Sequence, residues 1–337
     1  MEEVFPGIFL IKQKGFFGHI KPPENIYILA GHDGIVYDAG YGNRKTVKKF
    51  IKDLNDVKKS YEEHKRIFKL TRILVSHGHP DHFSGLKKIR KALGVKVVLT
   101  EKTAEIIRNK NNFGRSFNAD NYKDHFIVKK GLGYRIRSFV QKIFSNFFFK
   151  QIYGLSFITD PDEIIAENAQ ISINNENWQI IHSPGHAVDH ISLYNEEKGV
   201  LLSGDNILNS MTTWLGPPNC NIEDYNNSID TIRKLDNLKI ILPAHGSVIA
   251  HPKERLTEIL EHRKKRTQQV LDLIQNSSKN GISPDEIIRR LYPTGKRMQF
   301  EIARGWVSLT IKLLESKNLV KRNEEKKKIK FYPVNSF

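Results

Sequence analysis

The stretch His77-Gly78-His79-Pro80-Asp81-His82 places three imidazoles and one carboxylate within six consecutive residues. It follows the apolar run Ile73-Leu74-Val75, which predicts a short buried strand, so we expect the stretch in the loop at that strand's carboxyl end. Alternate side chains of an extended segment point the same way, which lets His77 and His79 hold one metal ion. The last two residues follow where the chain turns into a helix, so they project differently and suit a second ion. Nitrogen and oxygen ligands at this density are typical of a catalytic metal site.

Three further positions share one form, an apolar strand followed by a small or rigid residue and then a residue of metal-ligand type. They are His186 after the predicted strand 178–182, Asp205 after 200–203, and His245 after 240–242. Sites in layered α/β proteins are usually built in loops at strand ends. Any one of these residues alone would be interpreted as structural. Together with the histidine stretch they predict a single constellation.

Length and composition bound the class of protein. A chain of 337 residues predicts two domains. No apolar run approaches the ~20 residues needed to cross a bilayer. The start, Met1-Glu2-Glu3-Val4, lacks the basic and then apolar order of a signal peptide. The single Cys220 allows no internal disulfide. We therefore expect a cytoplasmic protein.

The net charge of +17 is unevenly spread along the chain. Residues 108–150 hold 10 Lys/Arg against 2 Asp/Glu, and residues 250–337 hold 20 against 10. The rest of the chain is close to neutral. Two basic segments attached to a neutral body favour phosphates, nucleic acid or an anionic membrane surface. Charge kept for solubility is the alternative, and composition leaves the choice open.

In their order along the chain, these motifs resemble those of the metallo-β-lactamase superfamily over roughly residues 1–250. The resemblance implies an α/β fold, a four-layer αββα sandwich with a binuclear metal site at one edge. It also implies a ligand set, namely His77, His79 and His186 for the first ion, Asp81, His82 and His245 for the second, and Asp205 shared by both. Asp38 resembles the first aspartate of the family's motifs, which supports the site without binding metal.

Elementary metal chemistry agrees with that implication. Two cations about 3.5–4 Å apart that share a carboxylate can hold a hydroxide and lower its pKa from about 15.7 towards neutrality. That hydroxide is the expected nucleophile, so the bridging Asp205 and the neighbouring Asp81, which is placed to orient it, are the candidate catalytic residues. Zinc is favoured by the imidazole-rich shell, although iron or manganese also accept mixed nitrogen and oxygen ligands. Hydrogen bonds must fix each imidazole tautomer, and Asp38 is placed to offer one.

The sequence differs from the true β-lactamases of the superfamily in one residue that bears on antibiotic hydrolysis. True β-lactamases of the superfamily generally lack the bridging aspartate and often have a cysteine in that region. Here Asp205 occupies it and Cys220 lies elsewhere in the sequence, so antibiotic hydrolysis is not expected. The full His/Asp set instead resembles the glyoxalase II, thioesterase, lactonase and ribonuclease branches. His182 and His190 flank His186, and either is a candidate for supporting it.

Residues 108–160 are longer than the connection that such a sandwich needs, and long insertions are often functional. Apolar side chains recur within them at three- and four-residue steps, which predicts an amphipathic helix with a basic opposite face. The apolar positions are Leu132, Ile136, Phe139, Val140, Ile143, Phe144, Phe147, Phe148 and Ile152. Three roles stay open: packing on the sandwich, a lid over the metal cleft, or a surface that meets lipid.

Residues 253–337 predict a second domain after a catalytic domain of residues 1–252. A long helix at about 256–275 and a helix start at Ser283 precede a third helix at about 298–316, which is expected to bury Ile302 and Trp306. A hairpin around 323–325 then completes the pattern of a winged helix. With His262-Arg263 in the long helix, this resembles the lactamase-beta-2-like branch, which includes endoribonucleases of single-stranded RNA and thioesterases. Nucleic-acid binding, inert packing and homodimer formation are all open for such a unit.

The ligand set does not choose among substrates, because paired ions attack esters, thioesters, lactones and phosphodiesters alike. We predict a zinc-dependent hydrolase of a small acyl ester or thioester, since the aromatic insertion favours an apolar substrate. The alternative is an endoribonuclease that binds single-stranded RNA through the basic insertion and the winged helix. A nucleic-acid-binding protein with an inactive metal site is the third hypothesis, and the complete ligand set argues against it.

Overall fold

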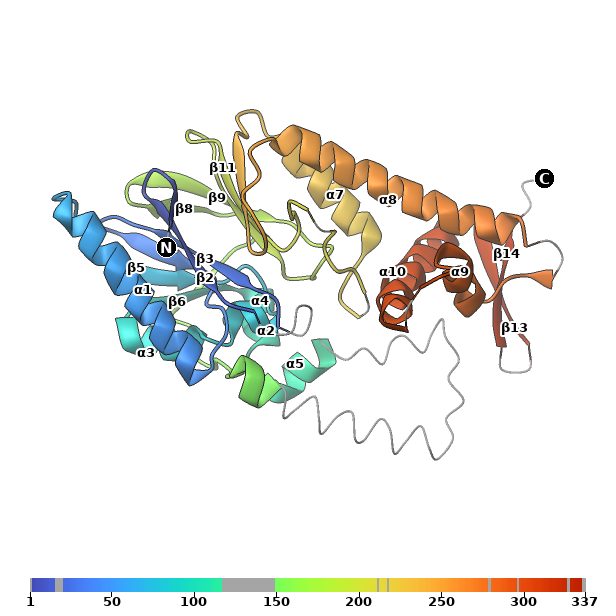
Figure 1. The fold of residues 1–337 in the computed structure, drawn as a ribbon, viewed down its shortest axis with the longest axis horizontal. Coiled ribbons are helices and arrows are strands. Elements are labelled where there is room, and N and C mark those ends of the chain that lie inside the picture. The colour runs from blue at the N-terminus through green and yellow to red at the C-terminus, as the bar shows by residue number, and fades with distance from the viewer. Residues whose placement is uncertain are drawn as a thin grey trace.

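Two β-sheets lie face to face between two layers of helices, and a smaller unit follows at the C-terminal end (Figure 1). The structure is a computed structural model that describes residues 2–15, 21–116, 149–210, 212–216, 218–277, 280–295, 297–325 and 328–334. The four-layer sandwich expected from the sequence is confirmed, and its two sheets determine where the strand-end loops can meet.

The first sheet contains seven strands in chain order. They are β1 (Glu2–Phe5), β2 (Ile8–Gln13), β3 (Glu24–Leu29), β4 (Gly34–Tyr37), β5 (Leu70–Leu74), β6 (Lys96–Thr100) and β7 (Glu163–Ile165). The pairs from β1 to β4 are antiparallel, and those from β4 to β7 are parallel. The carboxyl ends of β4 and β5 therefore lie at one edge, where Asp38 and the His77 loop follow them.

The second sheet has five strands in the order β12-β11-β10-β9-β8. Their bounds are β8 (Gln170–Ile173), β9 (Glu176–His182), β10 (Ile191–Asn195), β11 (Val200–Gly204) and β12 (Ile240–Pro243). Buried side chains such as Tyr37 and Trp178 fill the space between the sheets. The Tyr37 hydroxyl donates to the Ile191 carbonyl at 3.0 Å, so a polar contact also fixes one sheet against the other.

Helices cover the outer face of each sheet. α1 (Arg44–Glu63) and α3 (Leu86–Leu93) pack on the first sheet through side chains such as Phe50 and Ile89. α7 (Ile222–Arg233) and the first half of α8 (Pro252–Gln275) cover the second sheet. The Asn43 side chain accepts from the Thr46 backbone N–H and so begins α1.

The inserted segment is described only at its two ends. α4 (Glu101–Ile106) precedes it, and its described ends contain α5 (Lys110–Ser116) and the π-helical turn η3 (Phe149–Tyr153). The amphipathic helix expected from residue 132 onward lies mostly outside the described residues, so its three proposed roles stay predictions. None of the helices in the described part of the chain combines the length and hydrophobicity that a bilayer crossing requires.

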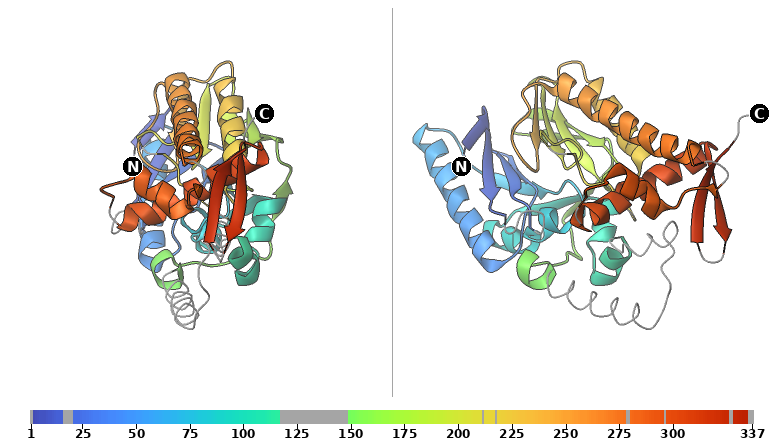
Figure 2. Two further views of the ribbon diagram at one scale, coloured as in Figure 1. Left: turned by 90° about the vertical axis from the view of Figure 1, so that its right-hand side faces the viewer. Right: turned by 45° about the vertical axis from the view of Figure 1, so that its right-hand side comes forward.

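The C-terminal unit contains the expected three helices and hairpin. α9 (Pro284–Leu291) and α10 (Arg297–Ser316) pack on the second half of α8, and β13 (Val320–Glu325) pairs with β14 (Lys328–Pro333). Figure 2 shows this hairpin at the end of the molecule farthest from α1. Trp306 is buried as expected, whereas Ile302 is 43% exposed. The winged-helix class and the domain boundary after residue 252 stay predictions.

Candidate metal site

The His77 loop lies where the sequence predicted it, between the end of β5 and a short helix. α2 (Pro80–Phe83) begins at Pro80, so His77 and His79 are in the extended loop and Asp81 and His82 are on the helix. The Gly78 backbone N–H between the two loop histidines donates to Asp189 Oδ2 at 2.8 Å. The same oxygen accepts from the Thr103 hydroxyl at 2.9 Å. This buried carboxylate therefore fixes the loop to α4.

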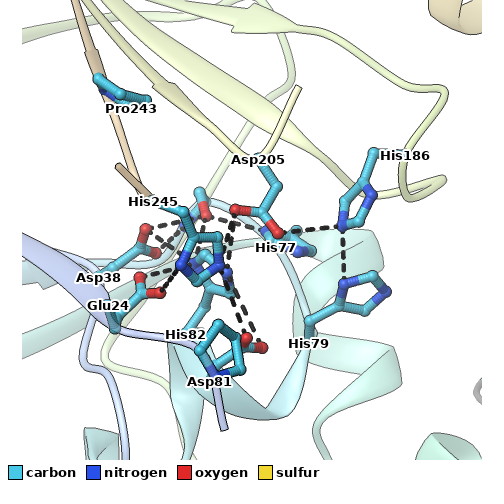
Figure 3. Close-up of polar contacts among 12 residues, drawn as sticks. Glu24, Asp38, His77, His79, Asp81, His82, His186, Asp205, Pro243 and His245 are labelled. Carbon is cyan, nitrogen blue, oxygen red and sulfur yellow. Dashed lines mark hydrogen bonds and ion pairs between the residues drawn. The ribbon is translucent and has the colours of Figure 1, made fainter. Parts of the chain in front are cut away.

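All seven expected ligands come together at one edge of the two sheets (Figure 3). The structure divides them into two groups, with Asp205 facing both. Asp205 Oδ2 lies 3.3 Å from His186 Nε2. Asp205 Oδ1 lies 3.2 Å from His245 Nε2 and 3.5 Å from His82 Nε2. The two oxygens of one side chain thus face different histidines.

The first group consists of His77, His79, His186 and Asp205, and the second of Asp81, His82 and His245 together with Glu24. His186 Nε2 and His79 Nδ1 are 2.9 Å apart. Two ligands of one tetrahedral ion with bonds of 2.0–2.1 Å are separated by about 3.3 Å, so this spacing is close to that of a ligand pair. The donor set of imidazoles and carboxylates is also one that divalent transition metals accept.

Several buried polar atoms in these groups have no hydrogen-bond partner among the described residues. Three of them are His77 Nε2, His82 Nε2 and Asp205 Oδ1. Leaving such atoms unpaired in a protein interior costs free energy, and nearly all buried polar atoms find a partner. Because all three atoms face the space that the two groups enclose, a pair of cations would satisfy them. The residues present therefore fit metal ions.

Asp38 and Ser76 orient two of the imidazoles. His82 Nδ1 donates to Asp38 Oδ2 at 3.0 Å, and the Ser76 hydroxyl donates to the same oxygen at 3.1 Å. The Ser76 hydroxyl oxygen in turn accepts from His77 Nδ1 at 3.0 Å. Since each Nδ1 carries the ring proton, each Nε2 presents a lone pair to the enclosed space.

Backbone carbonyls orient two other imidazoles in the same way. His186 Nδ1 donates to the Trp214 carbonyl at 2.8 Å, and His245 Nδ1 donates to the Pro23 carbonyl at 2.6 Å. In the neutral form of each ring, Nε2 therefore also carries no proton, and it is directed at Asp205. Four of the five histidines are thus held in the tautomer that a metal ion requires of them.

The electrostatic surroundings of the two groups differ. Burial lowers the pKa of His77 and His79 well below its ordinary value, and neighbouring imidazoles lower it further. Burial alone would also lower the pKa of His82, but the carboxylates of Glu24, Asp38 and Asp205 raise it well above the ordinary value. The second group therefore has more carboxylates around it than the first, and their negative charge favours a bound cation.

Sequence reasoning missed Glu24. This residue begins β3 and is fully buried, with Oε1 3.3 Å from His82 Nδ1 and Oε2 3.2 Å from His245 Nδ1. Burial raises the pKa of Glu24 well above its ordinary value, although both imidazoles lower it. A single acidic residue before an apolar strand is ordinarily interpreted as a solvated strand end. No signal in the sequence distinguishes this one.

The two histidines that flank His186 differ in what they contact. His190 Nε2 accepts from the Asp205 backbone N–H at 3.1 Å, while His190 Nδ1 donates to the Ser183 hydroxyl at 2.9 Å. His190 therefore positions the shared aspartate. His182 instead contacts Glu167 at 3.3 Å, away from the two groups.

Cys220 lies beside the site, although it is not in either group. Its thiol donates to the His186 carbonyl at 2.8 Å, and the side chain is buried. Burial raises the pKa of Cys220 to about 12. The thiol therefore stays protonated, and a protonated thiol is neither a metal ligand nor a nucleophile.

Two large apolar side chains near His186 are exposed to solvent. Val188 is 43% exposed and Trp214 is 42% exposed. The Trp214 ring lies 6.5 Å from the His186 ring, between centroids and in an edge-on arrangement. Trp214 also rests on Gly216, where an added Cβ would clash with the indole ring. The exposed Trp214 ring therefore offers apolar surface beside His186 of the first group.

The sequence matches a model of the family described as the metallo-beta-lactamase superfamily over residues 21–245. A Caenorhabditis elegans protein named beta-lactamase-like protein 2 homolog is 26% identical over 252 residues, which are 74% of this chain and 65% of that protein. The Drosophila melanogaster protein of the same name is 25% identical, covering 80% and 74% of the two chains. The match thus spans just under two thirds of the nematode protein. An Aspergillus fumigatus atrochrysone carboxyl ACP thioesterase is 27% identical over 120 residues, 35% of this chain and 36% of that enzyme.

Solved structures show the same fold over nearly the whole chain. A metallo-beta-lactamase family protein from Thermus thermophilus aligns with a TM-score of 0.69 at 21% identity, covering 98% of this chain and all of the other. A beta-lactamase domain protein from Burkholderia ambifaria aligns with a TM-score of 0.76 at 18% identity, covering 99% and 93%. At these identities the likeness concerns the fold alone.

Proposed function

The chain belongs to the metallo-β-lactamase superfamily, and from this premise we propose that it hydrolyses small acyl esters or thioesters with two divalent metal ions, zinc by preference. It is a hydrolase of that superfamily with side chains able to hold metal. The proposed ligands are His77, His79 and His186 for the first ion, Asp81, His82 and His245 for the second, and Asp205 for both.

The observation that carries this proposal is the position of Asp205 between the two groups. One of its oxygens faces the first group and the other faces the second. The Asp205 backbone N–H donates to His190, which fixes the main chain from which the carboxylate projects. A pair of divalent ions bound there would lower the pKa of a water molecule between them and supply a nucleophile at neutral pH.

The chain's own residues hold and orient the reacting groups. Asp81 Oδ2 lies 3.7 Å from His245 Nε2, and in this proposal it orients the attacking water and accepts its proton. Asp38 accepts the Nδ1 proton of His82, which leaves Nε2 as the nitrogen that would bind the metal. Both carboxylates therefore act on the nucleophile's surroundings, Asp81 directly and Asp38 through an imidazole.

Two observations favour an acyl substrate. Val188 and Trp214 present apolar surface beside the first group, where a hydrocarbon chain would be removed from water. In addition, one relative is named as a thioesterase acting on an acyl carrier protein. A small ester or thioester with an apolar acyl group fits both observations.

Single-stranded RNA is the competing substrate, and fewer observations support it. Arg304 is one of two cationic side chains in the middle of α10, and it pairs with Asp285 at 3.2 Å. A helix that reads nucleic acid needs such cations free for phosphates or bases. The net charge of +17 nonetheless makes RNA a necessary arm of any test.

The test compares metal-loaded protein on acyl thioesters and on single-stranded RNA, with Asp205→Ala beside the wild type. We expect thioester turnover that is insensitive to salt and falls at least about 100-fold in Asp205→Ala, because a shared ligand is lost. Asp230→Ala on the surface of α7 is the matched control and should match the wild type, since Asp230 pairs with Arg233 and Lys234 of its own helix end, away from the site.

Three results would contradict the proposal. The proposal would lose its basis if elemental analysis found no transition metal in the purified protein and if added metal did not bind. Equal activity of Asp205→Ala and wild type would discredit the assigned ligands. RNA cleavage that weakens as salt rises, without thioester turnover, would replace the acyl substrate by a nucleic acid.

A further inference from the structure

The start of β3 is fastened to the loop that carries His245. The Asn25 backbone N–H donates to the Ala244 carbonyl at 2.8 Å. The Asn25 side-chain amide donates to the carbonyls of Pro243 at 2.8 Å and Gly246 at 3.0 Å. The Tyr27 hydroxyl also donates to the Pro243 carbonyl at 2.8 Å. Four hydrogen bonds therefore tie the first sheet to a ligand loop of the second.

Glu24 lies at the centre of this junction. Its side chain is fully buried, and its two oxygens face different histidines of the second group, His82 from α2 and His245 from the loop after β12. Figure 3 shows the Glu24 carboxylate next to the ring of His245. One carboxylate thus contacts an imidazole that follows the first sheet and another that follows the second.

Glu24 faces the Nδ1 atoms of these rings, opposite the Nε2 atoms that point to Asp81 and Asp205. It therefore lies behind the imidazoles and is not a ligand itself. The Nδ1 protons already go to Asp38 and to the Pro23 carbonyl, at shorter distances. Both Glu24 oxygens consequently lack a hydrogen bond among the described residues.

A buried carboxylate without a donor is costly unless positive charge lies nearby. Asp38, Asp81 and Asp205 already place carboxylates around the second group, so a further buried carboxylate there adds to the negative charge that a cation has to balance. A divalent ion at the second group reverses this balance, because it attracts Glu24 through both imidazoles. The unfavourable placement is explained if the second ion is normally bound.

We propose that Glu24 is a positioning residue for the second metal ion. Its carboxylate holds the imidazoles of His82 and His245 in the positions that bind this ion, and it compensates the ion's positive charge. This inference rests on the ligand assignment of the proposed function. It adds a selective effect, since the histidines that Glu24 contacts in the described structure both belong to the second group. The second ion should depend on Glu24 and the first should not.

The test titrates zinc and cobalt into metal-free protein and measures two stoichiometric binding steps, with the cobalt absorption spectrum as a second readout. For Glu24→Gln, which keeps the shape and removes the charge, we expect the second ion to bind about 10- to 100-fold more weakly and the first to bind as in the wild type. The cobalt band of the second step should shift or disappear. Glu24→Asp should restore part of the affinity.

Glu176→Gln is the matched control, because Glu176 begins β9 and pairs with Lys198 away from the site. Thermal unfolding of the metal-free proteins separates a positioning role from a structural one. We expect Glu24→Gln to unfold close to the wild-type temperature without metal, because glutamine keeps the shape of a side chain that accepts no hydrogen bond among the described residues. A lower unfolding temperature with unchanged affinity for the second ion would overturn the inference.

Other outcomes are equally decisive. Equal weakening of both ions would mean that Glu24 supports the whole site and not the second ion. A second-ion affinity within about threefold of the wild type would also refute the inference while leaving the ligand assignment intact, because an orienting partner is expected to contribute at least tenfold. A wild-type protein that binds no metal would instead refute the proposed function.

Discussion

At the scale of single residues, the site depends on where each imidazole proton is held. His82, His186 and His245 donate from Nδ1 to Asp38, the Trp214 carbonyl and the Pro23 carbonyl. Two of these three acceptors are backbone atoms, which no substitution of a side chain can remove directly. Substitutions of Trp214 or Pro23 should therefore disturb the orientation of His186 or His245 only slightly. A substitution of Asp38 should disturb the orientation of His82 more.

Trp214 offers a test of substrate class at this scale. Trp214→Ala removes an exposed apolar ring beside His186 but leaves the carbonyl that orients it. If an acyl chain covers about 50 Å² of that ring, its contact contributes about 1.3 kcal/mol. We expect kcat/KM for an octanoyl thioester to fall about 10-fold, and that for an acetyl thioester to change less than about threefold. Steady-state kinetics on the two substrates measures the difference.

Trp214→Phe is the control for this prediction, because a smaller aromatic ring should recover most of the octanoyl activity. Metal content should equal that of the wild type in both variants. An equal loss on the two substrates would mean that Trp214 supports the loop and does not contact the acyl chain.

At the scale of elements, the sequence predicted most strands and helices from periodicity, and it predicted the strand-end loops that carry His77, Asp205 and His245. The family match confirms the resemblance that these motifs carried. Near the start of the chain, Gly7 with φ +79° separates β1 from β2, so this segment forms two strands and not one. Glu24 could not be predicted, because its partners lie far along the chain and only the packing of two sheets brings them together.

A glycine next to His186 gives a prediction for the β9 loop. Gly185 has φ +137°, and an added Cβ would clash with the Cα of Tyr225 in α7. Gly185→Ala therefore combines backbone strain with a clash against main-chain atoms that cannot rotate away. We expect the free energy of unfolding to fall by about 2–4 kcal/mol, measured by urea denaturation, together with weaker binding of the first metal ion.

Gly94 at the end of α3 is the matched control for this clash. It also has a positive φ, of +67°, but an added Cβ would meet nothing within 4 Å among the described residues. Gly94→Ala should cost about 1–2 kcal/mol and leave metal binding unchanged, because only the backbone strain is present. Equal losses in the two variants would mean that Tyr225 does not confine the His186 loop.

At the scale of the whole molecule, α8 connects two hydrophobic cores. Its first half contributes Leu256 and Ile259 to the layer that covers the second sheet, and its second half contributes Val270 and Ile274 to the C-terminal unit. Leu309 of α10 also packs on the sandwich side. The helix is continuous through both cores (Figure 1). The domain boundary predicted after residue 252 therefore falls at the start of a helix that both cores share.

Two truncations test how the sandwich depends on this helix. Residues 1–252 would lose Leu256 and Ile259, whose burial contributes about 1.5–3 kcal/mol each, and would expose the apolar side of α7. We expect this fragment to aggregate, or to unfold at least about 10 °C below the full chain. Residues 1–277 keep all of α8 and should stay folded and bind metal, with Val270 and Ile274 newly exposed. Thermal unfolding and metal analysis of both fragments measure the difference. If residues 1–252 were as stable as the full chain, the predicted boundary would be correct and the shared helix would add nothing to the sandwich.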